Sequence, residues 1–305
     1  MTETVHGSPV REAPPHPVPT LAAPSVMEAA CRHAIAEAEA ALTLTDPVRA
    51  VHDLRKAFKR LRALLRLVGG DHRAAAKALR AALGAAARQL AGARDTQARR
   101  DALDDLAGKN YLSSPKHRQA ARALAAGGAH EAAGLAPHRD DIAALVAACR
   151  EAVPRFALRM DRAALLRGLR DDYARGRRLI RQVDPADPES LHELRKAVVA
   201  QRYQMELMSE AWPALGRVWV AELQRLRDKL GKHQDLAVLA AELASLPPAR
   251  AGRQGWRVPL ANAIAARQER LVLSALRLHH RLFAETPRAF RRRLKVYLKA
   301  VSEKE

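Results

Sequence analysis

The feature that most constrains the fold of this chain is an internal repeat. Residues 51–68 read VHDLRKAFKRLRALLRLV and residues 191–208 read LHELRKAVVAQRYQMELM, so that seven of 18 positions are identical at an offset of 140. The offset persists downstream at three further pairs: Leu83/Leu223, Leu90/Leu230 and Asp95/Asp235. A gapless match over about 45 residues indicates two homologous halves that carry the same motif in pseudo-symmetric positions.

The composition favours helices throughout. Aromatic residues make up only 4% of the chain, its apolar residues are mostly Ala, Leu and Val, and no segment alternates long enough to indicate a strand. Asp46-Pro47 and Asp187-Pro188 each pair an N-cap residue with proline at the first helical position. We expect an all-α protein of two pseudo-symmetric helical bundles: a disordered Pro-rich tail over 1–24, a first half over 25–157 and a second half over 158–305.

The first copy of the repeat separates charge from hydrophobicity. On a helical wheel, five basic side chains fall inside an arc of about 80°: His52, Arg55, Lys59, Arg62 and Arg66. The apolar side chains fall on the other side: Leu54, Phe58, Leu61, Leu64, Leu65 and Val68. At ~1.5 Å per residue the basic stripe runs ~21 Å. Like charges at this spacing repel, so the stripe predicts an anionic ligand.

The second copy carries a shorter and less basic stripe. It keeps His192, Arg195 and Arg202. Val199 replaces the lysine and Glu206 the last arginine of the first copy. Lys56 and Lys196 flank the stripes, and Tyr203 lies beside Arg202 and can supply a hydroxyl donor. A recurring His-x-x-Arg in one helical phase favours ligand binding over a solvated face.

The net charge agrees with an anionic partner. The chain has 53 Lys and Arg against 33 Asp and Glu, a formal charge of +20, which predicts binding to a polyanion. Further basic stripes could extend the surface: Arg73, Lys77 and Arg80 in the first half, and Arg288, Arg292 and Lys295 near the end. Asp95 follows Leu90-Ala91-Gly92 and Asp235 follows Leu230-Gly231, and both segments resemble helix ends. We therefore expect the two aspartates to cap new helices or to orient a stripe arginine.

Several functions are disfavoured by missing chemistry. The sequence has no Gly-rich phosphate loop, no nucleophile elbow and no His-Glu-x-x-His motif, since Leu194, Arg195 and Lys196 follow His192-Glu193. We therefore expect no catalytic residues, no metal and no cofactor. Cys31 and Cys149 are expected as buried thiols of a reducing compartment. No apolar run approaches the ~20 residues of a membrane span, so we expect a cytoplasmic protein without a membrane partner.

The repeated motif resembles that of a known family. His52-x-x-Arg55-x-x-x-Lys59-x-x-Arg62 and its echo from His192 to Tyr203 are similar to the signature of the CHAD domain, the conserved histidine α-helical domain. The segment 230–236 resembles that family's second motif, which adds Lys232 and His233 as phosphate contacts. The resemblance implies two bundles with a basic channel between them that binds inorganic polyphosphate. It also implies an association with polyphosphate or polyhydroxyalkanoate granules.

Three classes of function follow. The first is non-enzymatic binding of polyphosphate through an Arg/Lys/His channel, which suits a flexible ligand with about one charge per phosphate. The alternative is a nucleic-acid-binding protein using the same surface, disfavoured by scarce aromatics and by the absence of a helix-turn-helix pattern. The third is a phosphohydrolase, disfavoured by the lack of metal-ligand clusters.

Overall fold

The structure is a computed structural model that describes residues 23–90, 92–126, 134–185, 187–246 and 255–302. Over these residues it is all-α, with no strand. Its α-helices are α1 (Ala23–Leu42), α2 (Pro47–Leu64), α3 (Arg73–Gln89), α4 (Gly92–Gly108), α5 (Ser114–Ala126), α6 (Arg139–Leu158), α7 (Arg162–Gln182), α8 (Pro188–Met208), α9 (Pro213–Ser245), α10 (Arg257–Leu282) and α11 (Pro287–Ser302). Short 3-10 helices lie at η1 (Leu65–Leu67), η2 (Gly70–His72), η3 (Ala136–His138) and η4 (Ser209–Ala211).

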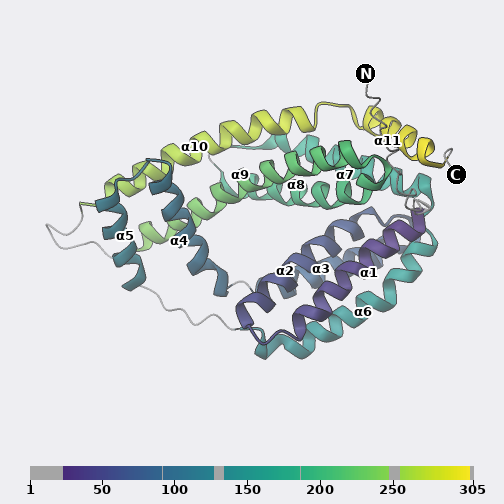
Figure 1. The fold of residues 1–305 in the computed structure, drawn as a ribbon, viewed down its shortest axis with the longest axis horizontal. Coiled ribbons are helices and arrows are strands. Elements are labelled where there is room, and N and C mark those ends of the chain that lie inside the picture. Colours follow the sequence, from purple (N-terminus) through teal and green to yellow (C-terminus); the bar gives the residue numbers. More distant parts are fainter. Residues whose placement is uncertain (1–22, 91, 127–133, 186, 247–254, 303–305) are drawn as a thin grey trace, which may run out of the picture.

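The first bundle is made of α1, α2, α3 and α6, which lie side by side (Figure 1). The N-cap predicted at Asp46 is confirmed, because its carboxylate accepts hydrogen bonds from the backbone N–H groups of Val48 and Arg49. The apolar arc of α2 is buried as expected, with Leu54 and Phe58 completely inaccessible. The remaining face of α2 is therefore free to carry charge.

Two buried thiols lie in the same bundle. Cys31 on α1 and Cys149 on α6 are both free and buried, as predicted. Burial raises the pKa of the Cys31 thiol to about 12 and that of Cys149 to about 11. Both side chains therefore stay protonated and serve as small apolar groups in the packing of α1 on α6.

The second set of helices is assembled around α8. The cap predicted at Asp187 is confirmed, since its carboxylate accepts from the N–H groups of Glu189 and Ser190. Helix α8 packs against α2, α7 and α9, so the two repeated helices are in direct contact. One hydrophobic core extends from α1 to α11, and both groups of helices contribute to it.

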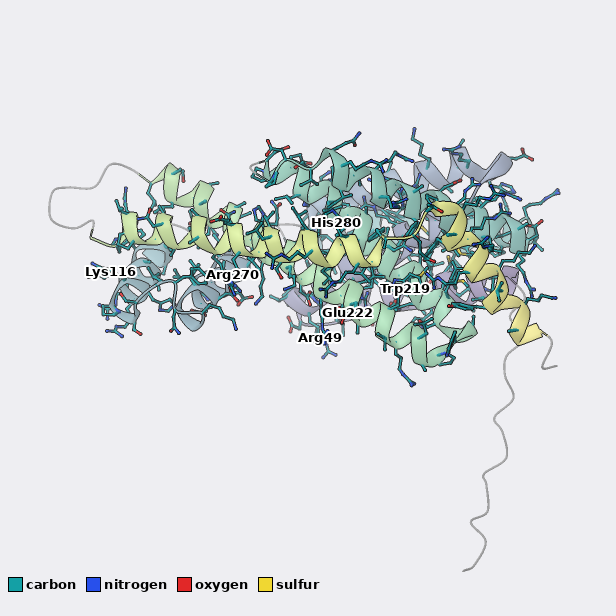
Figure 2. All side chains as sticks on the ribbon, turned by 90° about the horizontal axis from the view of Figure 1, so that it is seen from above. Arg49, Lys116, Trp219, Glu222, Arg270 and His280 are labelled. Carbon is teal, nitrogen blue, oxygen red and sulfur yellow. The ribbon has the colours of Figure 1, made fainter. Side chains whose placement is uncertain are left out.

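An arm formed by α4 and α5 extends the molecule. These helices pack on the far ends of α9 and α10 in Figure 1, away from the first bundle that flanks them in sequence. A separate core joins Leu103 and Leu106 of α4 to Leu239 of α9 and Leu260 of α10. In Figure 2 Lys116 marks this arm at the left end of the molecule, and Trp219 lies in the other half. The division into halves at residues 157 and 158 stays a prediction.

The expected helix end at Leu230-Gly231 is wrong. Helix α9 runs without a break for 33 residues through Gly231 and Asp235, so Asp235 is an interior residue and not an N-cap. The buried positions explain the continuity, because they follow one another every three or four residues through this region: Leu223, Leu226, Leu230, His233, Leu236 and Leu239. Asp95 likewise lies inside a helix, α4, and not ahead of it.

Gly168 provides a test of how closely α7 packs on η1. A Cβ atom added there would lie 2.7 Å from the carbonyl oxygen of Leu67, a backbone atom that has no rotamer to move. We expect Gly168→Ala to lower the free energy of unfolding by about 2 kcal/mol through overpacking. Gly108→Ala is the matched control, because nothing lies within 4 Å of its added Cβ. Urea unfolding curves of equal midpoint for the two variants would contradict the packing.

The Pro-rich tail predicted over 1–24 lies almost entirely outside the residues that the structure describes. Within the described part of the chain, every helix is too short or too polar to cross a lipid bilayer.

Candidate functional site

A groove collects basic side chains from both copies of the repeated helix. It has a volume of about 680 Å³ and lies between α2, α8 and α9, with one residue from α4; it is called the α2–α8–α9 groove below. Its charged and polar lining residues are Asp46, Arg49, His52, Arg55, Lys56, Lys59, Asp101, Arg202, Tyr203, Gln224 and Arg227. Six lining residues are Arg or Lys, against two aspartates, so the groove has a net positive charge.

The stripe on α2 does not face this groove along its whole length. His52, Arg55 and Lys59 line the groove. Arg62 lies instead against α3, where a Cβ added to Gly84 would be 3.3 Å from its guanidinium carbon. Arg66 lies beyond the end of α2, in η1, and forms a bidentate ion pair with Asp172 of α7. The neighbours of α2 therefore divide one basic stripe between separate surfaces.

Arg55 has a structural contact in addition to its place in the groove. Its guanidinium donates a hydrogen bond to the carbonyl oxygen of Ala87, one of the last four residues of α3. Carbonyls at that position have no partner within their own helix, and the C-terminus of a helix attracts cations. Arg55 thus fixes α3 against α2 while it faces the groove.

We therefore expect Arg55→Ala to destabilise the protein, although the side chain lies on the polar face of α2. Loss of the charged donor to the end of α3 should lower the free energy of unfolding by about 1–2 kcal/mol. Lys77→Ala, an exposed substitution on the same α3, is the control and should change it little. Chemical denaturation measures both; equal stability of Arg55→Ala and wild type would show that the contact with Ala87 contributes nothing.

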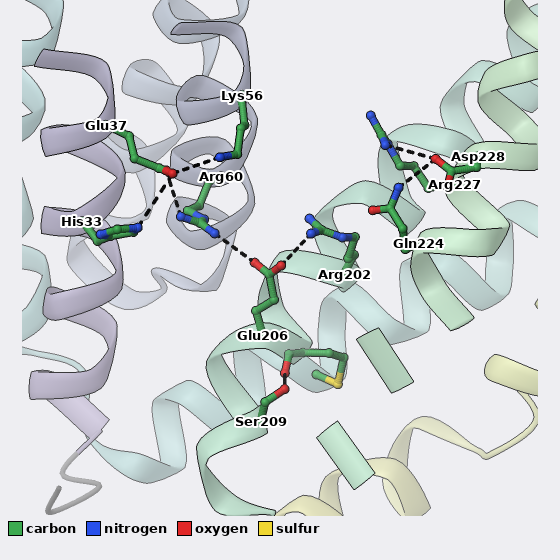
Figure 3. A network of polar contacts seen from close by, with 11 residues as sticks. His33, Glu37, Lys56, Arg60, Arg202, Glu206, Ser209, Gln224, Arg227 and Asp228 are labelled. Carbon is green, nitrogen blue, oxygen red and sulfur yellow. Dashed lines mark hydrogen bonds and ion pairs between the residues drawn. The ribbon is translucent and has the colours of Figure 1, made fainter. Parts of the chain in front are cut away.

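Figure 3 shows a chain of ion pairs that ties α1, α2 and α8 together beside the groove. Glu37 on α1 contacts Lys56 at 3.1 Å and Arg60 at 2.8 Å. Arg60 also reaches Glu206 on α8 at 3.4 Å, and Glu206 binds Arg202 at 2.7 Å. These side chains are half-buried, so their pairing is less screened than at an open surface. Glu206 therefore positions two arginines.

Tyr203 forms part of the groove wall between these arginines. Its ring centroid lies 4.7 Å from the guanidinium carbon of Arg202 and 5.4 Å from that of Arg60. Tyr203 is 7% exposed and packs on Ala63 and Ala200 at the α2–α8 contact. The ring thus holds the two guanidinium groups in place from the apolar side of the contact.

The start of the second stripe lies away from the lining of this groove. His192 is half-buried, and burial, followed by Lys196 and Arg195, lowers its pKa from the ordinary value. The guanidinium of Arg195 lies over Gly231, where an added Cβ would be 3.4 Å from a terminal nitrogen. Lys196 pairs with Glu193 at 2.6 Å. The lowered pKa favours the neutral form of His192, and its Nδ1 atom is buried without a hydrogen-bond partner in the described structure.

The additional basic residues are scattered over the molecule. Arg73 and Arg80 line a different cavity, between α3 and α7, and Lys77 is exposed on α3. Lys232 pairs with Asp105 of α4 at 2.6 Å, and His233 is 4% exposed, so we leave His233 out of the proposed site. Arg288, Arg292 and Lys295 are exposed on α11.

Several groove residues are missed by the sequence analysis. Arg49 stands three residues before His52 and extends the basic stripe by one step, so the sequence does contain a signal for this residue. Arg227 and Gln224 come from α9, and the first repeat has alanine and glycine at the equivalent positions. Arg60 and Glu37 could not be assigned, because their importance depends on how α1 packs against α2.

The comparisons with known proteins bear on these observations. A comparison with models of protein families matches residues 25–244 to the CHAD domain. Neither the search of curated proteins nor that of solved structures finds a match. The matched region contains both repeated helices and all the residues that line the α2–α8–α9 groove. Among the described residues, no three His, Cys, Asp or Glu side chains gather in a way that could hold a metal ion.

Proposed function

The chain belongs to the CHAD-domain family, and from this premise we propose that it binds inorganic polyphosphate through the α2–α8–α9 groove without transforming it. The family is associated with polyphosphate binding and is generally non-catalytic. The observation that carries the proposal for this chain is the groove itself, which draws its cations from both repeated helices and from α9.

The chemistry of the groove suits an unbranched phosphate chain. Polyphosphate carries about one charge per phosphate and no bases, so it is bound by repeated Arg and Lys side chains without stacking platforms. The one Phe, Tyr or Trp ring in the lining, Tyr203, is 7% exposed and already lies beside Arg202 and Arg60. This arrangement favours a phosphate chain over single-stranded nucleic acid, whose bases need exposed rings.

We infer further that the ligand follows a channel from this groove toward the second copy of the motif. By the repeat, Arg62 corresponds to Arg202. Arg62 and Arg195 each lie over a glycine of the next helix, Gly84 and Gly231. The extended site includes His192, Arg195, Lys196 and Arg62. Lys56 and Lys196 already pair with glutamates, so the ligand competes with those carboxylates.

A competition experiment separates this proposal from nucleic-acid binding. Polyphosphate should displace a bound fluorescent single-stranded DNA at equal phosphate concentration, whereas DNA should not displace polyphosphate. Displacement in the opposite direction would favour the nucleic-acid function. Phosphate release with and without Mg²⁺ should stay at background, and release dependent on the protein would indicate a phosphohydrolase. Attachment to polyphosphate or polyhydroxyalkanoate granules is tested by co-sedimentation of the protein with each purified granule.

A further inference from the structure

A second cavity of about 690 Å³ lies beside η1, beyond the end of α2, and none of its lining residues belongs to the α2–α8–α9 groove. One wall is formed by η1, η2 and α3, and the other by the end of α6 and by α7; it is called the α3–α7 groove below. Its charged lining residues are Arg66, Asp71, Arg73, Arg80, Arg159, Arg167, Asp171, Asp172, Arg175 and Arg178. Seven are arginines and three are aspartates, and none is a lysine.

Two of the three aspartates are already engaged. Asp172 forms the bidentate pair with Arg66 and also accepts a hydrogen bond of 2.7 Å from the amide of Gln204. Asp171 pairs with Arg170, which does not line the groove. The carboxylates of the groove therefore leave most of its arginines without a neutralising partner.

The floor of the groove holds two half-buried arginines. Burial lowers the pKa of both Arg80 and Arg175, and for each the positive charge of Arg66 contributes next, against the opposing effect of Asp172. Arg175 reaches Glu193 at 3.3 Å. The Nε atom of Arg80 is buried and has no hydrogen-bond partner in the described structure. A buried donor without an acceptor is costly, and an anion at this point would satisfy it.

The rim of the groove holds four exposed arginines, Arg73, Arg159, Arg167 and Arg178. In the described part of the chain, no carboxylate oxygen lies within 4.0 Å of any of their nitrogen atoms. The α2–α8–α9 groove differs in this respect, because Lys56, Arg202 and Arg227 each have an acidic partner. Of the two grooves, the α3–α7 groove thus has more arginines without an acidic partner.

We propose that the α3–α7 groove is a second ligand site that binds a compact oligophosphate, with two or more phosphate groups held together. Arginine forks bind phosphate oxygens in pairs, and the exclusive use of Arg suits such a ligand. The volume is that of a small-molecule site. Phe156 and Met160 add an apolar wall beside the charges. The same phosphate chemistry is available from a short inorganic chain or from a nucleoside triphosphate.

The test measures the binding of inorganic tripolyphosphate to the full chain by calorimetry. The double variant Arg159→Gln/Arg167→Gln removes two exposed rim charges, and its melting temperature verifies the fold. We expect it to bind tripolyphosphate at least about tenfold more weakly than wild type. Arg288→Gln/Arg292→Gln on α11 removes the same charge from exposed positions outside both grooves and should bind within about twofold of wild type. Equal affinities of the two double variants would overturn the proposal.

Two further measurements identify the ligand and separate this site from the polyphosphate groove. If ATP loses affinity in the rim variant by the same factor, the site accepts nucleotides; if only tripolyphosphate loses affinity, it takes inorganic chains. Long-chain polyphosphate should depend on Arg49 and Arg227 and be little affected by the rim variant. Failure of wild type to bind long chains would reject the proposed function alone, because the tripolyphosphate comparison does not depend on it.

Discussion

Raising the salt concentration should lower the affinity for long-chain polyphosphate with a log–log slope steeper than about −4. When a protein neutralises Z charges of a polyanion, condensed counterions are released. The logarithm of the affinity then falls with the logarithm of the salt concentration with a slope of roughly −0.7Z to −0.9Z, a relation established for nucleic acids. The α2–α8–α9 groove offers six Arg and Lys side chains. Engagement of all six therefore predicts a slope between about −4 and −5. Fluorescence titration with labelled polyphosphate at several salt concentrations measures it.

The variants make this prediction specific to the groove. Arg49→Gln/Arg227→Gln removes two of the six cations and should make the slope less steep by about 1.5. The α11 variant Arg288→Gln/Arg292→Gln removes the same charge outside the groove and should leave the slope unchanged. A nearly flat salt dependence in wild type, or equal slopes in the two variants, would place the ligand on another surface.

Acid should destabilise the protein through one buried histidine. His279 at the end of α10 is completely buried and stacks on Phe283 at a centroid distance of 4.2 Å. Burial, followed by the charges of His280 and Arg177, lowers the pKa of His279 to about 4. Below pH 6.5, which is the ordinary pKa of histidine, His279 takes up a proton in the unfolded chain but not in the folded protein. The contribution of neutral His279 to the stability of the fold is therefore present above pH 6.5 and is lost as the pH drops toward 4.

The size of this effect follows from the shift. A pKa lowered from 6.5 to about 4 corresponds to a loss of about 3 kcal/mol in the free energy of unfolding. The variant His279→Phe keeps an aromatic ring against Phe283. Its free energy of unfolding should fall less between pH 6.5 and 4 than that of wild type, by that amount. His33→Gln, at an exposed position on α1, is the control. Urea unfolding across this pH range measures it; an identical fall in both variants would rule out His279 as its source.

The sequence predicted the repeated helices well because their signals are local. The caps at Asp46 and Asp187 act within one turn, and the apolar arc of α2 is set by spacing alone. The fate of the basic stripe could not be predicted in the same way. A helical wheel places Arg66 beside His52, but the partner of each side chain depends on which helix crosses α2 at that height. Asp172, 106 residues away, decides the contact of Arg66.

Glu206 illustrates the same limit of local reasoning. Glu206 replaces the last arginine of the stripe in the first copy, which suggests that the second half binds an anion more weakly. In the fold its carboxylate joins Arg60 to Arg202, so that it holds two cations of different helices in position. A pattern within one helix identifies the charge of a side chain. Only the packing of α2 on α8 determines whether that charge opposes the site or organises it.

The arm of α4 and α5 has a consequence for how the protein is made. Asp105 on α4 pairs with Lys232 and Arg267, which are synthesised 127 and 162 residues later. At ~5–20 residues per second on the ribosome, the second partner is added about 10–30 s after Asp105. The contacts among α1, α2, α3 and α6, by contrast, can form once α6 is made. During this interval Leu103 and Leu106 lack the helices that cover them, so the arm of the nascent chain exposes apolar side chains until α9 and α10 are made.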